Sequence, residues 1–453
     1  MPPDATSDIR ARRLGRLAPD ERAAALCDAG TFVSERCDGV VLGTGHVDGR
    51  AVVVLATDGR VRGMGAVAGT RAAAAVRAAS GPVVLLLDSE GARTSEGVPA
   101  VLASADWLAA LADASGVVPL IAVIFGVAGG SAAYAAALCD LVVMVSERSF
   151  VFVAGPAVVQ AALGEMNDLA SLGGTRLQSS SGFVHLLADD DRAALAHARA
   201  TLARLPSNAA TLPPSAPPRA PRASTFTLPP PSRAYDVQTI IDALVDQATF
   251  IPLAPTFGAS IQTGLAAIDG EPVLLVASQP SELAGALDAC AAQKLARFVR
   301  FAAAFNLPIV TLCDTPGFLP GRAQEAQRIL VHGAKVIAAY AEARQSVPLV
   351  AVIARRAVGA GAVLAYGAHV VIALAGAEVQ QMGPAAAAAL HGIPTIGIPT
   401  NHLDPTATDP EATGFAHQTV TPELLRGALV DALAHVRTAR VASGRRKTSL
   451  VPL

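Results

Sequence analysis

The chain repeats one sequence pattern on both sides of a proline-rich segment. Between Leu212 and Pro231, eight of twenty residues are proline, a composition typical of an extended connection. Three motifs of the first half return in the second: VDGRAVVVL at 47–55 as IDGEPVLLV at 268–276, LLLDSEG at 85–91 as TLCDTPG at 311–317, and FGVAGG at 125–130 as RAVGAG at 356–361. The offsets are 221 (Asp48 to Asp269), 226 (Asp88 to Asp314) and about 230 (Gly130 to Ala360) residues. A nearly constant offset in three separate segments indicates that one domain was duplicated.

The duplication predicts the domain organisation. We expect a first domain over residues 1–208, an extended and poorly packed linker over 209–234, and a second domain over 235–453. In each copy, apolar strands alternate with helices in the same order, and an Asp-Gly hairpin joins two strands. The pattern of the second half predicts a helix over 281–305, a strand over 308–313 and a last helix over 422–438. This order is typical of an α/β fold with covered sheets, whose ligand sites lie at the carboxyl ends of the strands.

A long apolar stretch leaves a second interpretation open. Residues 117–145 include one charge, Asp140, and pass a crude test for a membrane span. Three glycines in the middle and many alanines favour instead a buried strand over 118–125, a glycine turn, a helix over 131–138 and a strand over 141–145. The comparable stretch at 347–377 contains two arginines, which a lipid-facing helix tolerates poorly. We therefore expect a soluble protein.

The composition excludes several classes of function. Hydrophobic residues make up 52% of the chain and charged residues 16%, which excludes a disordered protein. Lys and Arg number 35 against 37 Asp and Glu, so no basic surface field recommends nucleic acid or an anionic membrane as a partner. The five cysteines form no close pair, and the polar N-terminal segment has no apolar core of a signal peptide. We therefore expect a reducing, cytoplasmic location.

The glycine-rich turns at 129–131 and 359–361 carry the strongest chemical signal. A strand that ends in small residues and opens a helix presents unpaired backbone N–H groups, and these suit the negative oxygen that develops on a thioester carbonyl. The alternative is that small residues only permit close packing of helix and strand. The turn recurs at equivalent places in both halves, which strengthens the first interpretation, but the residues alone leave both open.

No conventional catalytic set accompanies the two turns. The nine histidines show no HExxH or other close metal spacing, and neither a GxSxG elbow nor a Walker A sequence is present. We therefore expect no metal, and chemistry by backbone donors and a bound cofactor. The chain has three lysines, at 294, 335 and 447, against 32 arginines. Lys294 and Lys335 are either retained for an ammonium group at the site or are exposed helix lysines without a role.

Motifs from both halves resemble those of one family, the carboxyltransferase (β) subunit of acyl-CoA carboxylases such as propionyl-CoA carboxylase. In the second half they are the segment 284–299, DTPGFLPG at 314–321, HGAK at 332–335 and YDV at 235–237. In the first half they are DGVV at 38–41, DGR at 48–50, GAR at 91–93, EGV at 96–98, SGVVP at 115–119, GP at 155–156 and LPSN at 205–208. The resemblance covers nearly the whole chain, and DTPGFLPG is very specific.

The resemblance implies two tandem crotonase-like domains of the ClpP/crotonase type, each a superhelix of ββα units. It also implies a homo-oligomer, from dimer to hexamer, with the active site between the first domain of one subunit and the second domain of its neighbour. Acyl-CoA, or an acyl thioester of a carrier protein, would bind mainly on the first domain and carboxybiotin on the second. One oxyanion hole would hold the thioester enolate and the other the ureido oxygen of biotin, whose nitrogen would be the base at the α-carbon.

By motif position, the resemblance also assigns site residues. The catalytic residues are Gly129, Gly130, Ser131, Ala360 and Gly361. The substrate-binding residues are Gly91, Ala92, Arg93, Lys294, Lys335 and Val363, the last at the position that sorts acyl groups in the family. The cofactor-binding residues are Gly317, Phe318 and Gly359. No cofactor is expected to be tightly bound; biotin would come with a partner protein, a biotin carboxylase or biotin carrier subunit, because the chain has neither a biotinyl Met-Lys-Met sequence nor an ATP-grasp region.

Three functions remain open at this level. The first is carboxyl transfer between carboxybiotin and the α-carbon of an acyl-CoA. The second is biotin-independent decarboxylation, or related enolate chemistry, of a malonyl- or methylmalonyl-type thioester. Shortened loops favour it, as does Glu90, which stands where the family has glycine and would repel an anionic thioester unless it has a partner or a new role. The third is a non-catalytic assembly paralogue, which the departures at Ser131 and Ala360 from the family's glycines would permit.

Overall fold

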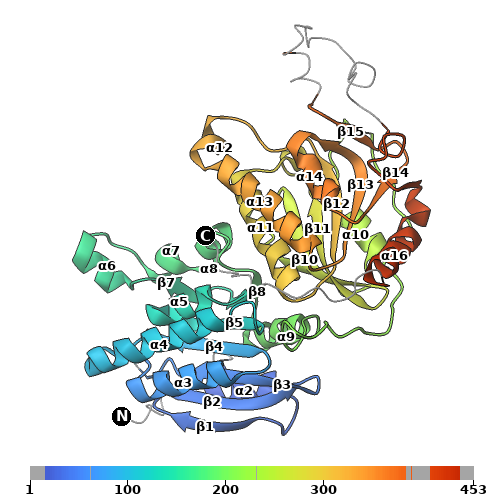
Figure 1. The fold of residues 1–453 in the computed structure, drawn as a ribbon. Helices are drawn as coiled ribbons and strands as arrows, with labels where there is room; N and C mark the ends of the chain where they lie inside the picture. Colours follow the sequence, from blue (N-terminus) through green and yellow to red (C-terminus); the bar gives the residue numbers. More distant parts are fainter. Residues whose placement is uncertain (1–15, 62, 231, 384–388, 390–408, 439–453) are drawn as a thin grey trace. The chain divides into compact units, whose positions relative to one another are not determined.

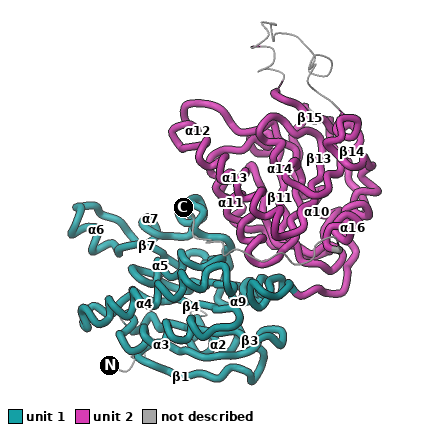
Figure 2. The backbone as a smooth tube through the Cα atoms, viewed as in Figure 1, with its two compact units in different colours: residues 1–213, 447–453 teal, residues 214–446 magenta. Residues whose placement is uncertain are grey.

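A computed structural model of the chain describes residues 16–61, 63–230, 232–383, 389 and 409–438. The chain divides into two compact units, the first ending at Pro213 and the second running from Pro214 to Arg446 (Figure 2). Within the described ranges, no helix is long and apolar enough to cross a membrane. All five cysteines are free thiols.

Each unit is built on an eight-stranded sheet, and the two sheets have the same strand order (Figure 1). The strands of unit 1 are β1 (Val33–Cys37), β2 (Val40–Val47), β3 (Arg50–Thr57), β4 (Val83–Ser89), β5 (Leu120–Gly129), β6 (Leu141–Val145), β7 (Phe150–Phe152) and β8 (Leu186–Ala188). Those of unit 2 are β9 (Ile251–Leu253), β10 (Ile261–Ile268), β11 (Glu271–Ser278), β12 (Ile309–Thr315), β13 (Leu349–Val358), β14 (Val370–Leu374), β15 (Glu378–Gln380) and β16 (Gln418–Val420). The orders are β1-β2-β3-β4-β5-β6-β8, with β7 also on β5, and β9-β10-β11-β12-β13-β14-β16, with β15 also on β13. The first three strands of each sheet are antiparallel and the rest are parallel, so the predicted duplication of an α/β domain is confirmed.

Helices cover the sheets. Unit 1 contains α2 (Pro19–Leu26), α3 (Ala66–Ala78), α4 (Val98–Ala114), α5 (Ser131–Ala137), α6 (Pro156–Leu163), α7 (Leu169–Gly173), α8 (Thr175–Ser180), α9 (Asp191–Leu202) and the turn η1 (Thr94–Glu96). Unit 2 contains α10 (Gln238–Leu244), α11 (Ala289–Ala304), α12 (Arg322–Ala326), α13 (Ile329–Arg344), α14 (Val363–Tyr366), α16 (Pro422–Thr438) and the turns η2 (Leu283–Gly285) and η3 (Gly359–Ala362). In unit 1, α3 and α4 share a buried core with strands β3 to β6, and α2 and α9 contact other positions of the same sheet. In unit 2, α10 and α16 share a core with β10 to β14, and Tyr340 of α13 bonds Thr311, which lies between the core positions of β12.

A polar clamp fastens the β2–β3 hairpin of unit 1. The carboxylate of Asp28 accepts hydrogen bonds from the backbone N–H groups of Asp48 and Gly49, both of which have left-handed φ angles. Arg199 of α9 bonds the same carboxylate at 2.9 Å. The bond from Gly49 and the nearby guanidinium lower the pKa of Asp28 to about 2. The clamp therefore joins the hairpin to a helix distant in the sequence.

The same clamp recurs in unit 2. Asp246 accepts hydrogen bonds from the N–H groups of Asp269 and Gly270, in the turn between β10 and β11. Arg426 of α16 bonds Asp246 at 2.8 Å. Asp246 is almost fully buried, with 1% of its surface exposed, whereas the carboxylate in the first clamp is 29% exposed. The contacts around both Asp-Gly hairpins thus repeat from one unit to the other.

The proline-rich segment is extended and largely exposed, as expected, but some of its backbone groups and one side chain have partners in unit 2. The N–H of Ala216 bonds the carbonyl of Gly270 at 2.8 Å, and the N–H of Ala223 bonds that of Asp242 at 3.0 Å. Phe226 is 7% exposed and belongs to the core of unit 2. Composition did not show that these backbone groups and Phe226 find partners on the second unit.

Two predicted element boundaries were wrong. The strand expected over 118–125 runs four residues further, to Gly129, because Asp88 accepts the N–H of Val127 and because β7 pairs with the end of β5. The glycine at 126 lets the strand pass this carboxylate: a Cβ there would lie 2.3 Å from Oδ1.

The helix expected over 281–305 begins only at Ala289. Leu283 and Ala284 have left-handed φ angles, and the carboxylate of Asp288 accepts the N–H of Ala291, capping α11. The strand expected over 308–313 and the last helix over 422–438 are confirmed as β12 and α16.

We predict that the buried clamp contributes more to stability than the exposed one. Asp246→Ala leaves Arg426 and three backbone N–H groups, those of Arg219, Asp269 and Gly270, without their acceptor in a dry environment, and we expect it to lower the free energy of unfolding by about 3 kcal/mol. Asp28→Ala should cost less, since water can replace its carboxylate. Urea unfolding of the full chain followed by circular dichroism measures both, and equal losses would contradict the prediction.

Candidate active site

The first glycine turn forms where β4 and β5 end side by side. The hydroxyl of Ser89 accepts the N–H of Gly91 at 3.2 Å, and the carbonyl of Gly91 accepts the N–H of Met64 at 2.7 Å. A Cβ on Gly91 would lie 2.7 Å from the carbonyl oxygen of Gly129 and 3.0 Å from the backbone nitrogen of Ser131. Glycine is therefore required at 91 because the backbone of the next strand passes directly over it.

The second glycine turn repeats this geometry at the ends of β12 and β13. The hydroxyl of Thr315 accepts the N–H of Gly317 at 3.0 Å, and the carbonyl of Gly317 accepts the N–H of Leu287. A Cβ on Gly317 would lie 3.1 Å from the carbonyl oxygen of Val358 and 4.0 Å from the nitrogen of Gly361. The two loops differ in sequence, but each places a glycine against the carbonyl of the last residue of the neighbouring strand.

Backbone angles fix how the turns correspond. Gly130 follows β5 with a φ of +53°, and Gly359 follows β13 with a φ of +54°. Ser131 therefore corresponds to Ala360. The sequence motifs alone placed Gly130 opposite Ala360 or Gly361, which the backbone corrects by one to two residues. The motifs misalign because the second turn, Gly-Ala-Gly, offers two glycines to align with one.

The turns are not buried in packing. Gly130, Ser131 and Gly359 are half-buried and Ala360 is exposed. Gly361, in contrast, is buried: a Cβ there would lie 2.8 Å from the Cα of Gly317. Gly361 therefore serves close packing, while the residues before it are open enough to meet a ligand.

Aspartates on β4 and β12 stabilise the strand ends that lead into the two turns. Asp88 is near Arg22, whose guanidinium lies 4.3 Å from the Phe125 ring centre, and burial raises the pKa of Asp88. Asp314 bonds the Nε of Arg355 at 2.6 Å. These carboxylates hold the strand ends in place and are occupied by protein groups.

Arg93, a predicted substrate-binding residue, is engaged within unit 1. Its guanidinium binds Asp38 at 2.6 Å and Glu96 at 2.9 Å. Glu96 in turn accepts the N–H of Ala66, at the start of α3, at 2.7 Å. Arg93 thus joins the loop after β4 to two neighbouring segments, and substrate binding by it stays a prediction.

Lys294 lies inside unit 2. It is 2% exposed, and its Nζ donates to the carbonyl of Ala254 at 3.2 Å. Burial lowers the pKa of Lys294 to about 7, although Asp288 acts in the opposite direction. Of the two alternatives, an exposed helix lysine is wrong for Lys294, whose Nζ faces protein rather than solvent. Binding of substrate by Lys294 stays a prediction.

The remaining predicted residues lie on elements of both units. Lys335 of α13 and Val363, the first residue of α14, are half-buried. The ring of Phe318 lies against Gly333 of α13, and Ala92 forms a single bridge with Met64. The structure brings Gly91 to the first turn and Gly317 to the second, while Lys294 and Arg93 are held in their own contacts.

Sequence reasoning missed the hydroxyl residues of the site. Ser89 and Thr315 bond the glycine two residues further on, and the repeat of Asp-Ser/Thr-x-Gly in both halves could have revealed them. Ser104 of α4, 5% exposed, bonds Ser131 at 3.4 Å. No local pattern marks this residue, because its role depends on how α4 packs.

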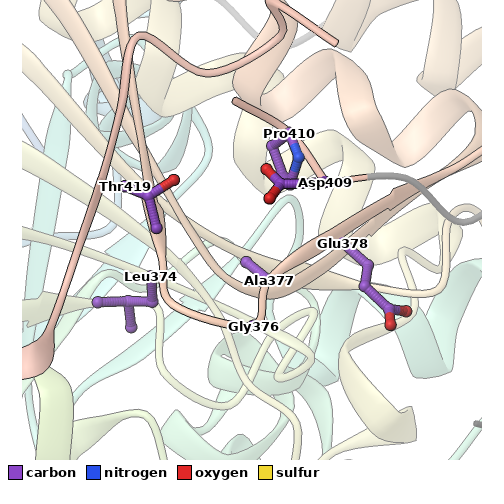
Figure 3. A pocket seen from close by; sticks show the side chains of 7 residues that line it. All are labelled: Leu374, Gly376, Ala377, Glu378, Asp409, Pro410 and Thr419. Carbon is purple, nitrogen blue, oxygen red and sulfur yellow. The ribbon is translucent and has the colours of Figure 1, made fainter. Parts of the chain in front are cut away.

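A separate pocket of about 250 Å³ lies at the carboxyl end of β14 (Figure 3). Its residues are Leu374, Gly376, Ala377, Glu378, Asp409, Pro410 and Thr419. Asp409 accepts the N–H of Glu411, and Glu378 accepts the side-chain amide of Gln380. Both carboxylates are thus engaged by the chain itself, so the pocket is not assigned to the site.

Known proteins share this sequence and fold. A family model described as the carboxyl transferase domain matches residues 20–391. The chain is 35% identical to methylmalonyl-CoA decarboxylase subunit alpha of Veillonella parvula, covering 97% of this chain and 94% of that protein. It is also 35% identical to the putative propionyl-CoA carboxylase beta chain of Bacillus subtilis, covering 98% and 95%. The hexameric transcarboxylase 12S, solved with hydrolysed methylmalonyl-coenzyme A bound, superposes with a TM-score of 0.90 at 29% identity, covering 98% of this chain and 94% of that one.

The duplicated unit with one glycine turn in each copy defines a protein of two crotonase-like domains, the fold of the transcarboxylase and acyl-CoA carboxylase structures that it matches. The chain belongs to the carboxyl transferase domain family. The family resemblance and the fold class expected from the motifs are both confirmed.

We predict a graded cost of alanine at four glycines with left-handed φ. In Gly164→Ala and Gly376→Ala the added Cβ meets no atom within 4 Å, so the free energy of unfolding should fall by about 1–2 kcal/mol through backbone strain alone. Gly317→Ala should lower the free energy of unfolding further. Gly91→Ala should lower it most, because a Cβ on Gly91 lies closer to the neighbouring carbonyl oxygen than a Cβ on Gly317 does. Urea unfolding tests this order, and four equal losses would show that the strand ends do not need this close approach.

We also predict a pH effect from Lys294. Because its pKa is near 7 in the folded chain, against 10.5 for an unperturbed lysine, the unfolded chain binds more protons between these values, so the contribution of Lys294 to stability rises with pH. Relative to Lys294→Met, the free energy of unfolding of the wild type should rise by about 1 kcal/mol per pH unit from pH 7 to 9. Urea midpoints at both pH values measure this, with Lys335→Met as the control for loss of charge. A difference that does not change with pH would contradict the prediction.

Proposed function

We propose that the chain is a carboxyltransferase subunit that moves a carboxyl group between biotin, carried by a partner protein, and the α-carbon of an acyl-CoA thioester. The observation that carries the proposal is the pair of equivalent turns, Gly91 with Gly130–Ser131 and Gly317 with Gly359–Ala360. The family and the named relatives, a propionyl-CoA carboxylase beta chain among them, support it.

The first turn would stabilise the thioester enolate. When the α-carbon loses a proton or a carboxyl group, negative charge moves to the thioester oxygen. Backbone N–H groups fixed at Gly130 and Ser131 can donate to that oxygen without reorganising. Unit 1 would therefore bind acyl-CoA, with Gly91 and Ala92 beside the reacting carbon.

The second turn would receive the biotin of a partner subunit. Its open Gly359 and Ala360 fit a neutral ureido oxygen, which needs hydrogen-bond donors and no opposing charge, and Gly317 and Phe318 form the adjoining loop. Bound biotin supplies the carrier of the carboxyl group and the base at the α-carbon, which accounts for a site without a histidine or carboxylate pair. Lys335 and Val363 would complete the binding surface.

We further propose a homo-oligomer, dimer to hexamer, in which the first domain of one subunit meets the second domain of its neighbour. Apolar side chains stand exposed on α4, next to the first turn, at Val98, Val101 and Leu102. Surfaces of this kind are typical of protein interfaces. A cytoplasmic location, expected from the cysteines and the N-terminal segment, stays a prediction.

A second function is favoured by Glu90. Its backbone lies against the first turn, with its carbonyl oxygen 3.5 Å from the Cβ position of Gly130, and its side chain is exposed. The equivalent residue of the second turn is Pro316. A carboxylate here suits release of CO2 from a malonyl- or methylmalonyl-type thioester without biotin better than capture of an anionic carboxyl group. A relative is named methylmalonyl-CoA decarboxylase subunit alpha.

One assay separates the functions. Purified protein is mixed with malonyl-CoA or methylmalonyl-CoA, with and without biotin, and substrate loss is followed by chromatography. For the carboxyltransferase, loss requires biotin, and both Gly91→Ala and Gly317→Ala reduce the rate by about 100-fold or more. For the decarboxylase, loss occurs without biotin and only Gly91→Ala reduces it.

Gly164→Ala, which strains the backbone away from both turns, is the matched control and should keep the wild-type rate. The variants are compared at a temperature at which circular dichroism shows all of them folded. No substrate loss, even with biotin and a partner biotin carboxylase subunit present, would contradict both functions and leave an assembly paralogue.

A further inference from the structure

Two serine hydroxyls meet beside the first turn. The Oγ of Ser131 lies 3.4 Å from the Oγ of Ser104, and Ser104 is 5% exposed. Ser131 itself is half-buried, and its hydroxyl donates to Ser104 of α4. A hydroxyl can rotate its proton between neighbouring acceptors while its oxygen stays in place.

The hydroxyl and the backbone nitrogen of Ser131 face the same space. The Cβ position of Gly91 is 3.0 Å from the nitrogen and 3.3 Å from the Oγ of Ser131. The nitrogen and the hydroxyl of Ser131 therefore lie on the same side of the turn. A ligand oxygen that bonds the N–H of Ser131 is then close to its hydroxyl as well.

The second turn has no such group. Ala360 takes the place of Ser131 after Gly359, and it carries no hydroxyl. The hydroxyl is thus a feature of the turn in unit 1, without a counterpart in the turn of unit 2.

We propose that Ser131 is a further catalytic residue, whose hydroxyl donates a hydrogen bond to the thioester oxygen as it becomes negative, with Ser104 as its positioning residue. This rests on the proposed function. When charge develops, the proton of Ser131 turns from Ser104 to the oxygen, and the hydroxyl of Ser104 donates to the Oγ of Ser131. No covalent bond forms or breaks at either serine. A hydrogen bond to a charged oxygen is about twice as strong as one between neutral groups.

Steady-state kinetics of substrate loss in the full-length protein tests the proposal. Ser131→Ala keeps the backbone N–H and removes the hydroxyl, so kcat should fall by about 10- to 100-fold with little change in KM. Ser131→Thr should restore most of the rate. Ser104→Ala should lower kcat less than Ser131→Ala, since it removes only the orienting group. Ser180→Ala, on exposed α8, is the control and should behave as the wild type.

A binding measurement adds a readout independent of turnover. A nitronate analogue of propionyl-CoA carries negative oxygens that imitate the enolate. Calorimetry should show that Ser131→Ala weakens its binding by about 10-fold, while the affinity for neutral propionyl-CoA is unchanged. Unchanged kcat and unchanged nitronate affinity in Ser131→Ala would overturn the role of the hydroxyl and leave the proposed function standing. A wild type without turnover that does not bind the nitronate would overturn both.

Discussion

The close approach of backbone to backbone at the strand ends is the constraint on which the site depends. Gly91 and Gly317 each lie under the last residue of the neighbouring strand, with room for a hydrogen atom and no more. This contact fixes the position of the turn that follows the neighbouring strand. Each glycine is held by a hydrogen bond from its N–H to the hydroxyl of the residue two positions earlier, Ser89 or Thr315. The geometry of both turns thus depends on the absence of a side chain at Gly91 and at Gly317.

Features that depend on local periodicity or on internal repeats were predicted correctly from the sequence. The duplication, the Asp-Gly hairpins and the glycine turns were visible because glycine and aspartate are demanded by φ angles and close contacts that recur in both copies. Features that depend on a distant partner were predicted poorly. The extension of β5 to Gly129 depends on Asp88 and on β7, and the late start of α11 depends on the cap at Asp288.

The same reasoning explains which site residues were misjudged. Lysine is normally exposed, so nothing in the neighbourhood of Lys294 indicated that it lies 2% exposed against Ala254. Ser104 is an ordinary helix serine until α4 is packed against α5. Burial and side-chain pairing of this kind depend on the tertiary fold, so local sequence patterns do not predict them.

The two copies have kept one kind of contact and changed another. The hairpin clamps, Asp28 with Arg199 and Asp246 with Arg426, match atom for atom. The residues facing the turns differ: Glu90 against Pro316 and Ser131 against Ala360. The contacts that hold the hairpins have thus been retained while the side chains around the turns have diverged, as expected if each copy handles a different molecule.

The proline-rich segment also defines where the protein can be divided. Because Ala216, Ala223 and Phe226 make their contacts within unit 2, this part of the segment belongs structurally to the second unit. A fragment starting at Tyr235 would expose part of a hydrophobic core and remove the donors to the carbonyls of Gly270, in the β10–β11 hairpin, and Asp242, in α10. The natural border for exchanging or recombining halves among relatives lies upstream, between Pro213 and Pro214.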